Sequence, residues 1–72
     1  MPMKWPFHIR LIALRQARGY TQSDLAELVG VTQGSISRLE SGTIDPSFET
    51  LQALCAALGC TIDALCGPFS EP

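Results

Sequence analysis

The residues best suited to binding chemistry lie in the ten-residue segment from Thr32 to Ser41. If this segment is a helix, Ile36 and Leu39 mark one side of it, because residues three apart share a helix face. The opposite side then carries short or planar hydrogen-bonding groups instead of the Lys and Glu that usually cover a surface helix. Such groups suit base-pair edges, since Arg can bind guanine, and Gln adenine, through two hydrogen bonds. We expect base reading by Gln33, Gly34, Ser37 and Arg38.

Gly34 argues for this interpretation because it falls at the second helical position. A glycine there costs about 1 kcal/mol of helix propensity relative to alanine. A bare backbone that approaches DNA closely gives a reason for that cost. The alternative, in which small polar residues simply face solvent, leaves the glycine unexplained.

No catalytic or metal-binding pattern competes with this interpretation. His8 is the only histidine, and no carboxylate pair or phosphate-binding loop stands out, so we expect no enzyme, cofactor or metal. The cysteines are spaced C-x4-C-x5-C, whereas zinc sites favour C-x2-C pairs and four ligands. Core packing of Cys55, Cys60 and Cys66 is favoured, with a metal or redox role as the alternative.

Size and composition indicate one small domain that covers residues 1–72, with a core over residues 7–66 and short tails. The 72 residues are 46% hydrophobic, which favours a folded chain over a disordered one. Only 17% are charged, a low share that hints at a surface buried against a second copy. No signal peptide or apolar run of membrane-spanning length is present, so we expect a cytoplasmic protein without a membrane partner.

The charge distribution does not by itself indicate a nucleic-acid partner. The net charge is −2, with four basic and no acidic residues over 1–23, but one basic and seven acidic residues over 24–72. A strongly basic domain would have pointed directly to phosphate. Any DNA binding must therefore depend less on net charge than on particular groups.

Apolar spacing predicts five helices and no strand. Residues 7–18 form the first helix, and three further helices run from Thr21 to Gly30, over 32–41, and from Ser47 to Gly59; a short helix follows Thr61. The joint between the second and third helices is only Gly30-Val31, which turns the axes sharply, as in a helix-turn-helix unit. Ala26 must then be small, because the third helix crosses the second there.

Five residues of this unit carry a family resemblance: Gln22, Ala26, Gly30, Ile36 and Leu39, spaced 4, 4, 6 and 3. They resemble the helix-turn-helix of the phage-repressor and Cro-like DNA-binding regulators, and the resemblance covers roughly residues 8–66. It implies an all-α, five-helix fold like that of lambda repressor. It also implies sequence-specific binding of double-stranded DNA and regulation of transcription.

The phosphate contacts are expected away from the base-reading face. Gln22 combines an amide side chain with the free N–H groups at a helix start, a natural site for anionic oxygen. The resemblance implies phosphate contacts by Gln22 and Thr32, and by Ser41 and Thr43 in the turn after the third helix. The last two residues also fit an ordinary helix stop.

The resemblance implies a structural ion pair between Arg15 and Glu40 that ties the first helix to the third. It would remove Arg15 from the charges that neutralise phosphate. The chain departs from the family in the loop after the third helix, which reads "SGTIDPS" where related loops are often basic. Fewer basic residues near phosphate predict modest affinity for random DNA and a shallow salt dependence.

One recognition helix reads about half a site, so regulators of this kind bind as symmetric dimers. An interpretation in which the last helix is entirely internal core remains open. A second functional class also stays open, an antitoxin-like module in which the same fold masks a toxin or another protein. The residues that we expect at the interface of a homodimer are Cys60, Ile62, Leu65, Cys66 and Phe69.

Overall fold

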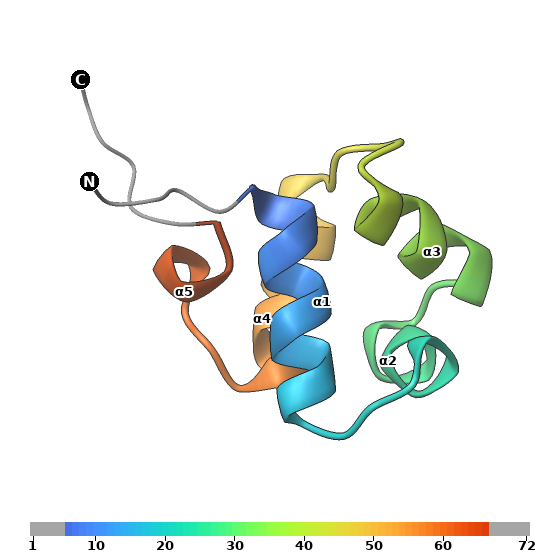
Figure 1. Cartoon of the computed structure of the whole chain (residues 1–72), viewed down its shortest axis with the longest axis horizontal. Coiled ribbons are helices and arrows are strands. Elements are labelled where there is room, and N and C mark those ends of the chain that lie inside the picture. The colour runs from blue at the N-terminus through green and yellow to red at the C-terminus, as the bar shows by residue number, and fades with distance from the viewer. Residues whose placement is uncertain (1–5, 67–72) are drawn as a thin grey trace.

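The computed structural model describes residues 6–66, and these form an all-helical fold (Figure 1). The five helices and the absence of strands in this part of the chain agree with the sequence prediction. Lys4 and Phe69 lie outside the described residues. The helices are α1 (Phe7–Ala17), α2 (Gln22–Val29), α3 (Gln33–Ser41), α4 (Phe48–Leu58) and α5 (Ile62–Cys66).

The helix boundaries follow from capping side chains in the sequence. Thr21 and Asp24 form a reciprocal capping box at the start of α2, and the hydroxyls of Thr32 and Ser47 accept backbone N–H groups at the starts of α3 and α4. Gly30 ends α2 with φ +87°, a left-handed conformation that glycine adopts without steric cost. Each of these signals lies at the helix end that it marks.

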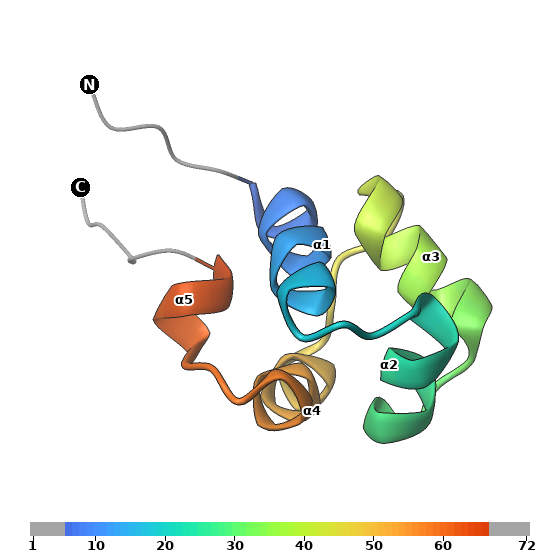
Figure 2. The ribbon, with the colours of Figure 1, turned by 60° about the horizontal axis from the view of Figure 1, so that its bottom comes forward.

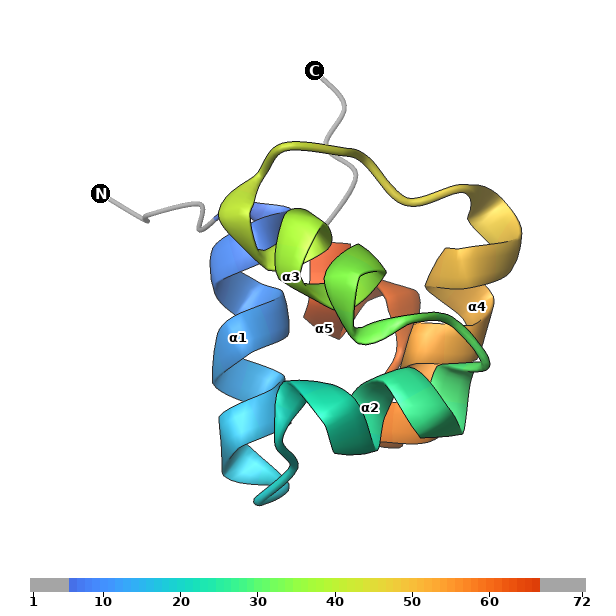
Figure 3. The same ribbon diagram turned by 90° about the vertical axis from the view of Figure 1, so that its right-hand side faces the viewer.

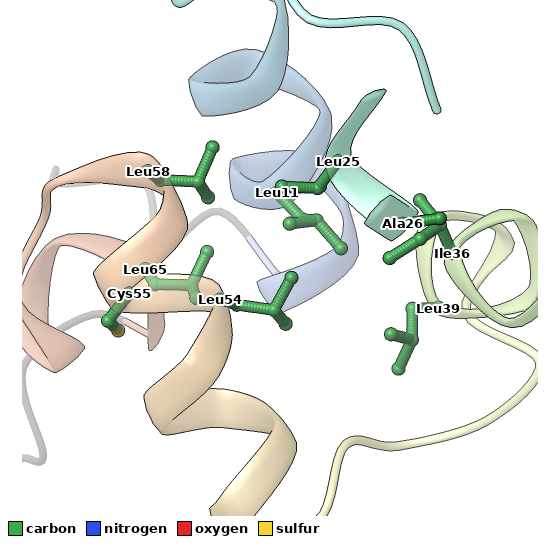
Figure 4. Close-up of a cluster of buried hydrophobic side chains, with 9 residues drawn as sticks. All are labelled: Leu11, Leu25, Ala26, Ile36, Leu39, Leu54, Cys55, Leu58 and Leu65. Atoms are coloured by element: carbon green, nitrogen blue, oxygen red, sulfur yellow. The ribbon is translucent and has the colours of Figure 1, made fainter. Parts of the chain in front are cut away.

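All five helices contribute to one hydrophobic core, whose side chains meet between them (Figure 4). Most of the buried side chains are leucines. They lie on the apolar stripe that each helix turns towards the others. Within residues 6–66, the one buried residue outside this apolar set is Glu40, whose charged side chain needs partners. The buried apolar residues are Leu11, Leu25, Ala26, Ile36, Leu39, Leu54, Cys55, Leu58 and Leu65.

Ala26 lies where α2 and α3 pack against each other, next to Ile36 (Figure 4). Its side chain is only 4% exposed. Its carbonyl oxygen accepts hydrogen bonds from the N–H groups of Gly30 and Val31, at 2.8 and 3.0 Å, which closes the turn. A longer side chain at this position would separate the two helices.

Helices α3 and α5 lie on opposite sides of the molecule. Figures 1 and 2 place α3 and α5 at the two ends of the view, with α1 between them, and Figure 3 places α5 behind α3. Leu65 of α5 is fully buried. Its side chain therefore packs in the monomer core and offers no surface to a second copy. None of the helices in residues 6–66 is long and apolar enough to cross a bilayer.

Candidate nucleic-acid interface

The α3 helix has one buried side and one solvent-exposed side, and it runs across the front of the view in Figure 3. Ile36, Leu39 and Glu40 face inward. The exposed side carries no acidic residue and a single basic one. Its residues are Gln33, Gly34, Ser37, Arg38 and Ser41.

Gly34 leaves room for Arg38 along this exposed side. A Cβ atom placed on Gly34 would lie 3.4 Å from Nη1 of Arg38 and 3.9 Å from Oγ1 of Thr32. The guanidinium therefore folds back over the glycine, one turn towards the start of the helix. This contact gives the glycine a second role, alongside the close backbone approach predicted from the sequence.

The end of α3 forms a compact cluster of hydroxyl groups. Ser41 donates its hydroxyl to the carbonyl oxygen of Arg38 at 3.1 Å, and its Oγ lies 2.7 Å from Oγ1 of Thr43. The backbone N–H of Thr43 also donates to Arg38, at 3.0 Å. Both hydroxyl residues are exposed and close a helix-ending turn, the structural role that the sequence left open.

Glu40 is the centre of a network that joins three helices. Nε of Arg15 donates to Oε2 of Glu40 at 2.6 Å, and Nη2 donates to Oε1 at 3.1 Å. Nη1 of Arg15 donates to the carbonyl oxygen of Tyr20 at 2.8 Å. The structure thus brings Arg15 and Glu40 together, with side chains only 13% and 5% exposed.

Gln22 joins the same network, which sequence reasoning missed. Its Nε2 donates to Oε1 of Glu40 at 2.9 Å. One amide hydrogen is therefore committed to the protein, and the other remains for an external acceptor. No local pattern predicts this contact, because it joins the first residue of α2 to the last turn of α3.

A second unpredicted contact holds the start of α3. Oγ of Ser23, on α2, donates to Oε1 of Gln33 at 3.0 Å. The two residues line a shallow recess between α2 and α3, together with Asp24, Glu27 and Val31. The side chain of Gln33 is therefore tied to the neighbouring helix.

Most of the described arginines are engaged with the protein itself. Arg18 donates to the carbonyl oxygen of Leu58 at 2.6 Å and closes the end of α4; Arg10 donates to Ala64 at 3.2 Å. Arg15 binds Glu40. Among residues 6–66, Arg38 is the arginine without a hydrogen bond or ion pair to the protein. Arg10 and Arg18 keep their positive charge, but these hydrogen bonds hold their side chains at α5 and at the end of α4 rather than at α3.

The cysteines are unpaired thiols at the junction of α4 and α5. Burial and, to a smaller extent, neighbouring Cys60 together raise the pKa of the Cys55 thiol to about 11. Burial also raises the pKa of Cys66. Protonated thiols are poor nucleophiles and metal ligands, so core packing accounts for Cys55. No group of three metal-binding side chains forms within the described residues.

Comparisons with known proteins agree with this architecture. Residues 11–65 match the family model HTH_3, described as Helix-turn-helix. The HTH-type transcriptional regulator PuuR of Escherichia coli K12 is 38% identical over 63 residues, 88% of this chain and 32% of PuuR. The putative antitoxin HigA3 of Mycobacterium tuberculosis is 48% identical over 52 residues, 69% of this chain and 48% of HigA3. The chain thus spans about a third of the length of PuuR and about half of the length of HigA3.

Two solved structures with a similar fold contain DNA. The P22 c2 repressor in complex with a synthetic operator superposes with a TM-score of 0.83 at 34% identity, covering 89% of this chain and 98% of the repressor chain. SinR, a Bacillus subtilis protein solved in complex with DNA, superposes with a TM-score of 0.78 at 30% identity. The superposition covers 82% of this chain and 95% of the SinR chain. The chain belongs to the helix-turn-helix family of the phage-repressor and Cro type, whose members are DNA-binding transcriptional regulators rather than enzymes.

Proposed function

We propose that this chain binds a short palindromic DNA operator as a homodimer, with α3 of each copy in the major groove. The observation that carries the proposal is the exposed side of α3, where small hydrogen-bonding groups and one unpaired arginine replace the usual charged surface. The operator complex of the P22 c2 repressor supports it, because its fold is the same. This role would place the protein in the bacterial cytoplasm.

The base contacts come from four residues of α3 in this proposal. Arg38 lies over Gly34 in the free protein and, once extended, would present a planar pair of donors suited to O6 and N7 of guanine. Gln33 stands at the helix start, Ser37 lies on the same exposed side, and Gly34 lets the backbone approach the bases. The carboxylate of Glu40 faces the protein and does not repel the DNA.

The phosphate contacts come from the ends of α2 and α3. Gln22 offers its second amide hydrogen beside the free N–H groups of the α2 start. Thr32 at the α3 start, and Ser41 and Thr43 at its end, carry exposed hydroxyls that would exchange their hydrogen bonds within the protein for a phosphate oxygen. These groups are neutral, so they position the duplex without much counterion release.

The dimer forms through the side of the molecule opposite α3. A two-fold axis beside α5 would leave α3 of each copy uncovered by its partner, so that each could enter one half-site. Of the residues expected at the dimer interface, those that are described and partly exposed are Cys60, Ile62 and Cys66. Leu65 is left out because it is fully buried.

The experiment is selection of bound duplexes from a random pool, combined with light scattering for mass. We expect an enriched palindrome and the mass of two chains. Arg38→Ala should cost about 1–3 kcal/mol and relax the preference at one base-pair position. Equal loss on all sequences would show a phosphate contact instead, and no enriched sequence would overturn the proposal.

A second candidate function is that of an antitoxin whose main partner is a protein. The similarity to HigA3 favours it, as does the acidic segment over residues 24–72, which suits a basic partner. An electrophoretic shift on the DNA upstream of its own gene separates the two functions. Binding below micromolar concentration at physiological salt supports the regulator, whereas no shift together with tight binding of a neighbouring gene's product supports the antitoxin.

A further inference from the structure

The orientation of the Gln33 side chain affects which base pairs α3 can prefer. This inference rests on the proposed role of α3 in the major groove. Gln33 is the first residue of α3 and is exposed, and Ser23 is exposed on the first turn of α2. Their hydrogen bond spans the recess between the two helices, with the serine hydroxyl as donor and Oε1 of Gln33 as acceptor at 3.0 Å.

This hydrogen bond decides which half of the amide faces outward. A glutamine amide is planar, with an acceptor oxygen on one side and two donor hydrogens on the other. When the oxygen is held against α2, the NH2 group projects away from Ser23. A free glutamine can instead turn either half towards a base, or present both to adenine.

We propose that Ser23 is a specificity-determining residue, which acts by positioning Gln33 as a hydrogen-bond donor. Base-pair edges with acceptors in the major groove then fit Gln33, namely guanine O6 and N7, adenine N7 and thymine O4. Cytosine is disfavoured, because its N4 group is a donor in the same groove. Ser23 itself touches no base in this arrangement.

Gln33 is the hydrogen-bond partner of the Ser23 hydroxyl, and the residues next to Ser23 in sequence are paired elsewhere. The capping box at the α2 start uses Thr21 and Asp24, whose side chains are already paired with backbone N–H groups. Gln22, the residue before Ser23, is directed to Glu40. The hydroxyl of Ser23 is thus committed to Gln33 rather than to the end of its own helix.

The test is selection of duplexes from a random pool with wild-type protein, Ser23→Ala, Ser23→Thr and Gln33→Ala. We expect Ser23→Ala to weaken the preference at one base-pair position by roughly three- to tenfold, the range of one net hydrogen bond. Ser23→Thr keeps the hydroxyl and should retain the wild-type preference. In a Gln33→Ala background, Ser23→Ala should change nothing further at that position.

The outcomes separate this inference from the function on which it rests. An unchanged preference in Ser23→Ala, with a changed one in Gln33→Ala, would overturn the role of Ser23 and leave the α3 reader intact. A uniform loss of affinity on all sequences in Ser23→Ala would identify a phosphate contact and also overturn it. If wild-type protein enriches no sequence, or if neither Gln33→Ala nor Arg38→Ala alters any preference, base reading by α3 fails and the inference fails with it.

Discussion

Arg15 and Gln22 donate hydrogen bonds to the same oxygen atom, Oε1 of Glu40, at 3.1 and 2.9 Å. These two residues belong to α1 and to the start of α2, and the carboxylate belongs to the last turn of α3. One buried acidic side chain therefore fixes α3 against both neighbouring helices. Its loss should affect folding and DNA binding together.

The Glu40→Ala variant should lower the free energy of unfolding by about 3 kcal/mol, because it leaves the nearly buried guanidinium of Arg15 without its charge partner. Urea denaturation followed by circular dichroism measures the change. Glu27→Ala, which removes an exposed glutamate on α2, is the control and should stay within about 0.5 kcal/mol of wild type. Similar effects of both variants would show that the network contributes nothing specific.

The Ala26→Leu variant should lose about 1–3 kcal/mol of stability, because three added carbon atoms have no space between α2 and α3. DNA affinity should fall with it, since α3 must shift. Ala56→Leu provides the matched control, because Ala56 is exposed on α4. A stable and fully active Ala26→Leu protein would contradict the close crossing of the two helices.

The salt dependence of DNA binding should be shallow. Three of the four described arginines bind groups within the protein, which leaves Arg38 in each copy. The charge of Arg38 enters the groove between the phosphates even when its guanidinium binds a base. With about 0.9 counterions released per such cation, a dimer should give a slope of about −2 in a plot of log K against log salt concentration. Fluorescence anisotropy at several salt concentrations measures this slope.

A Thr43→Lys variant should steepen that slope by about 2, because it adds one cation per half-site in the turn after α3. An unchanged slope would mean that this turn lies away from the backbone. A wild-type slope steeper than about −5 would show that more basic side chains than the two copies of Arg38 lie close to phosphates.

The raised pKa of Cys55 makes stability depend on alkaline pH. Its pKa is about 11 in the folded protein and 9.0 ordinarily, so between these pH values the folded state holds a proton that the unfolded state has lost. The free energy of unfolding should therefore fall as pH rises from 9 to 11. Cys55→Ala lacks this titration, so its stability deficit relative to wild type should narrow between pH 8 and pH 11. A constant deficit would contradict the burial of this thiol.

Helix positions could be predicted from the sequence because their signals are local. Thr21, Thr32 and Ser47 cap α2, α3 and α4 at the positions where the sequence predicted these helices to begin, and Gly30 ends α2 in the left-handed conformation. The family resemblance also predicted the five-helix fold correctly. The first helix ends one residue earlier than expected, at Ala17, because Arg18 forms its C-cap.

The long-range polar contacts could not be predicted in the same way. The hydrogen bonds of Arg18 with Leu58 and of Ser23 with Gln33 depend on how helices pack, which residue spacing does not encode. Leu65 shows the same limit for apolar residues. Its position in a helical stripe indicates an inward face, but only packing shows that it belongs to the monomer core.

The central claim is that the exposed side of α3 lies against base pairs, and NMR titration tests it most directly. The ¹⁵N-labelled protein would be titrated with the duplex enriched by selection, with amide shifts followed residue by residue. We expect the largest changes at Gln33, Gly34, Ser37 and Arg38, with small changes in α4 and α5. Unmoved α3 amides, together with large changes elsewhere in a saturated complex, would contradict the account.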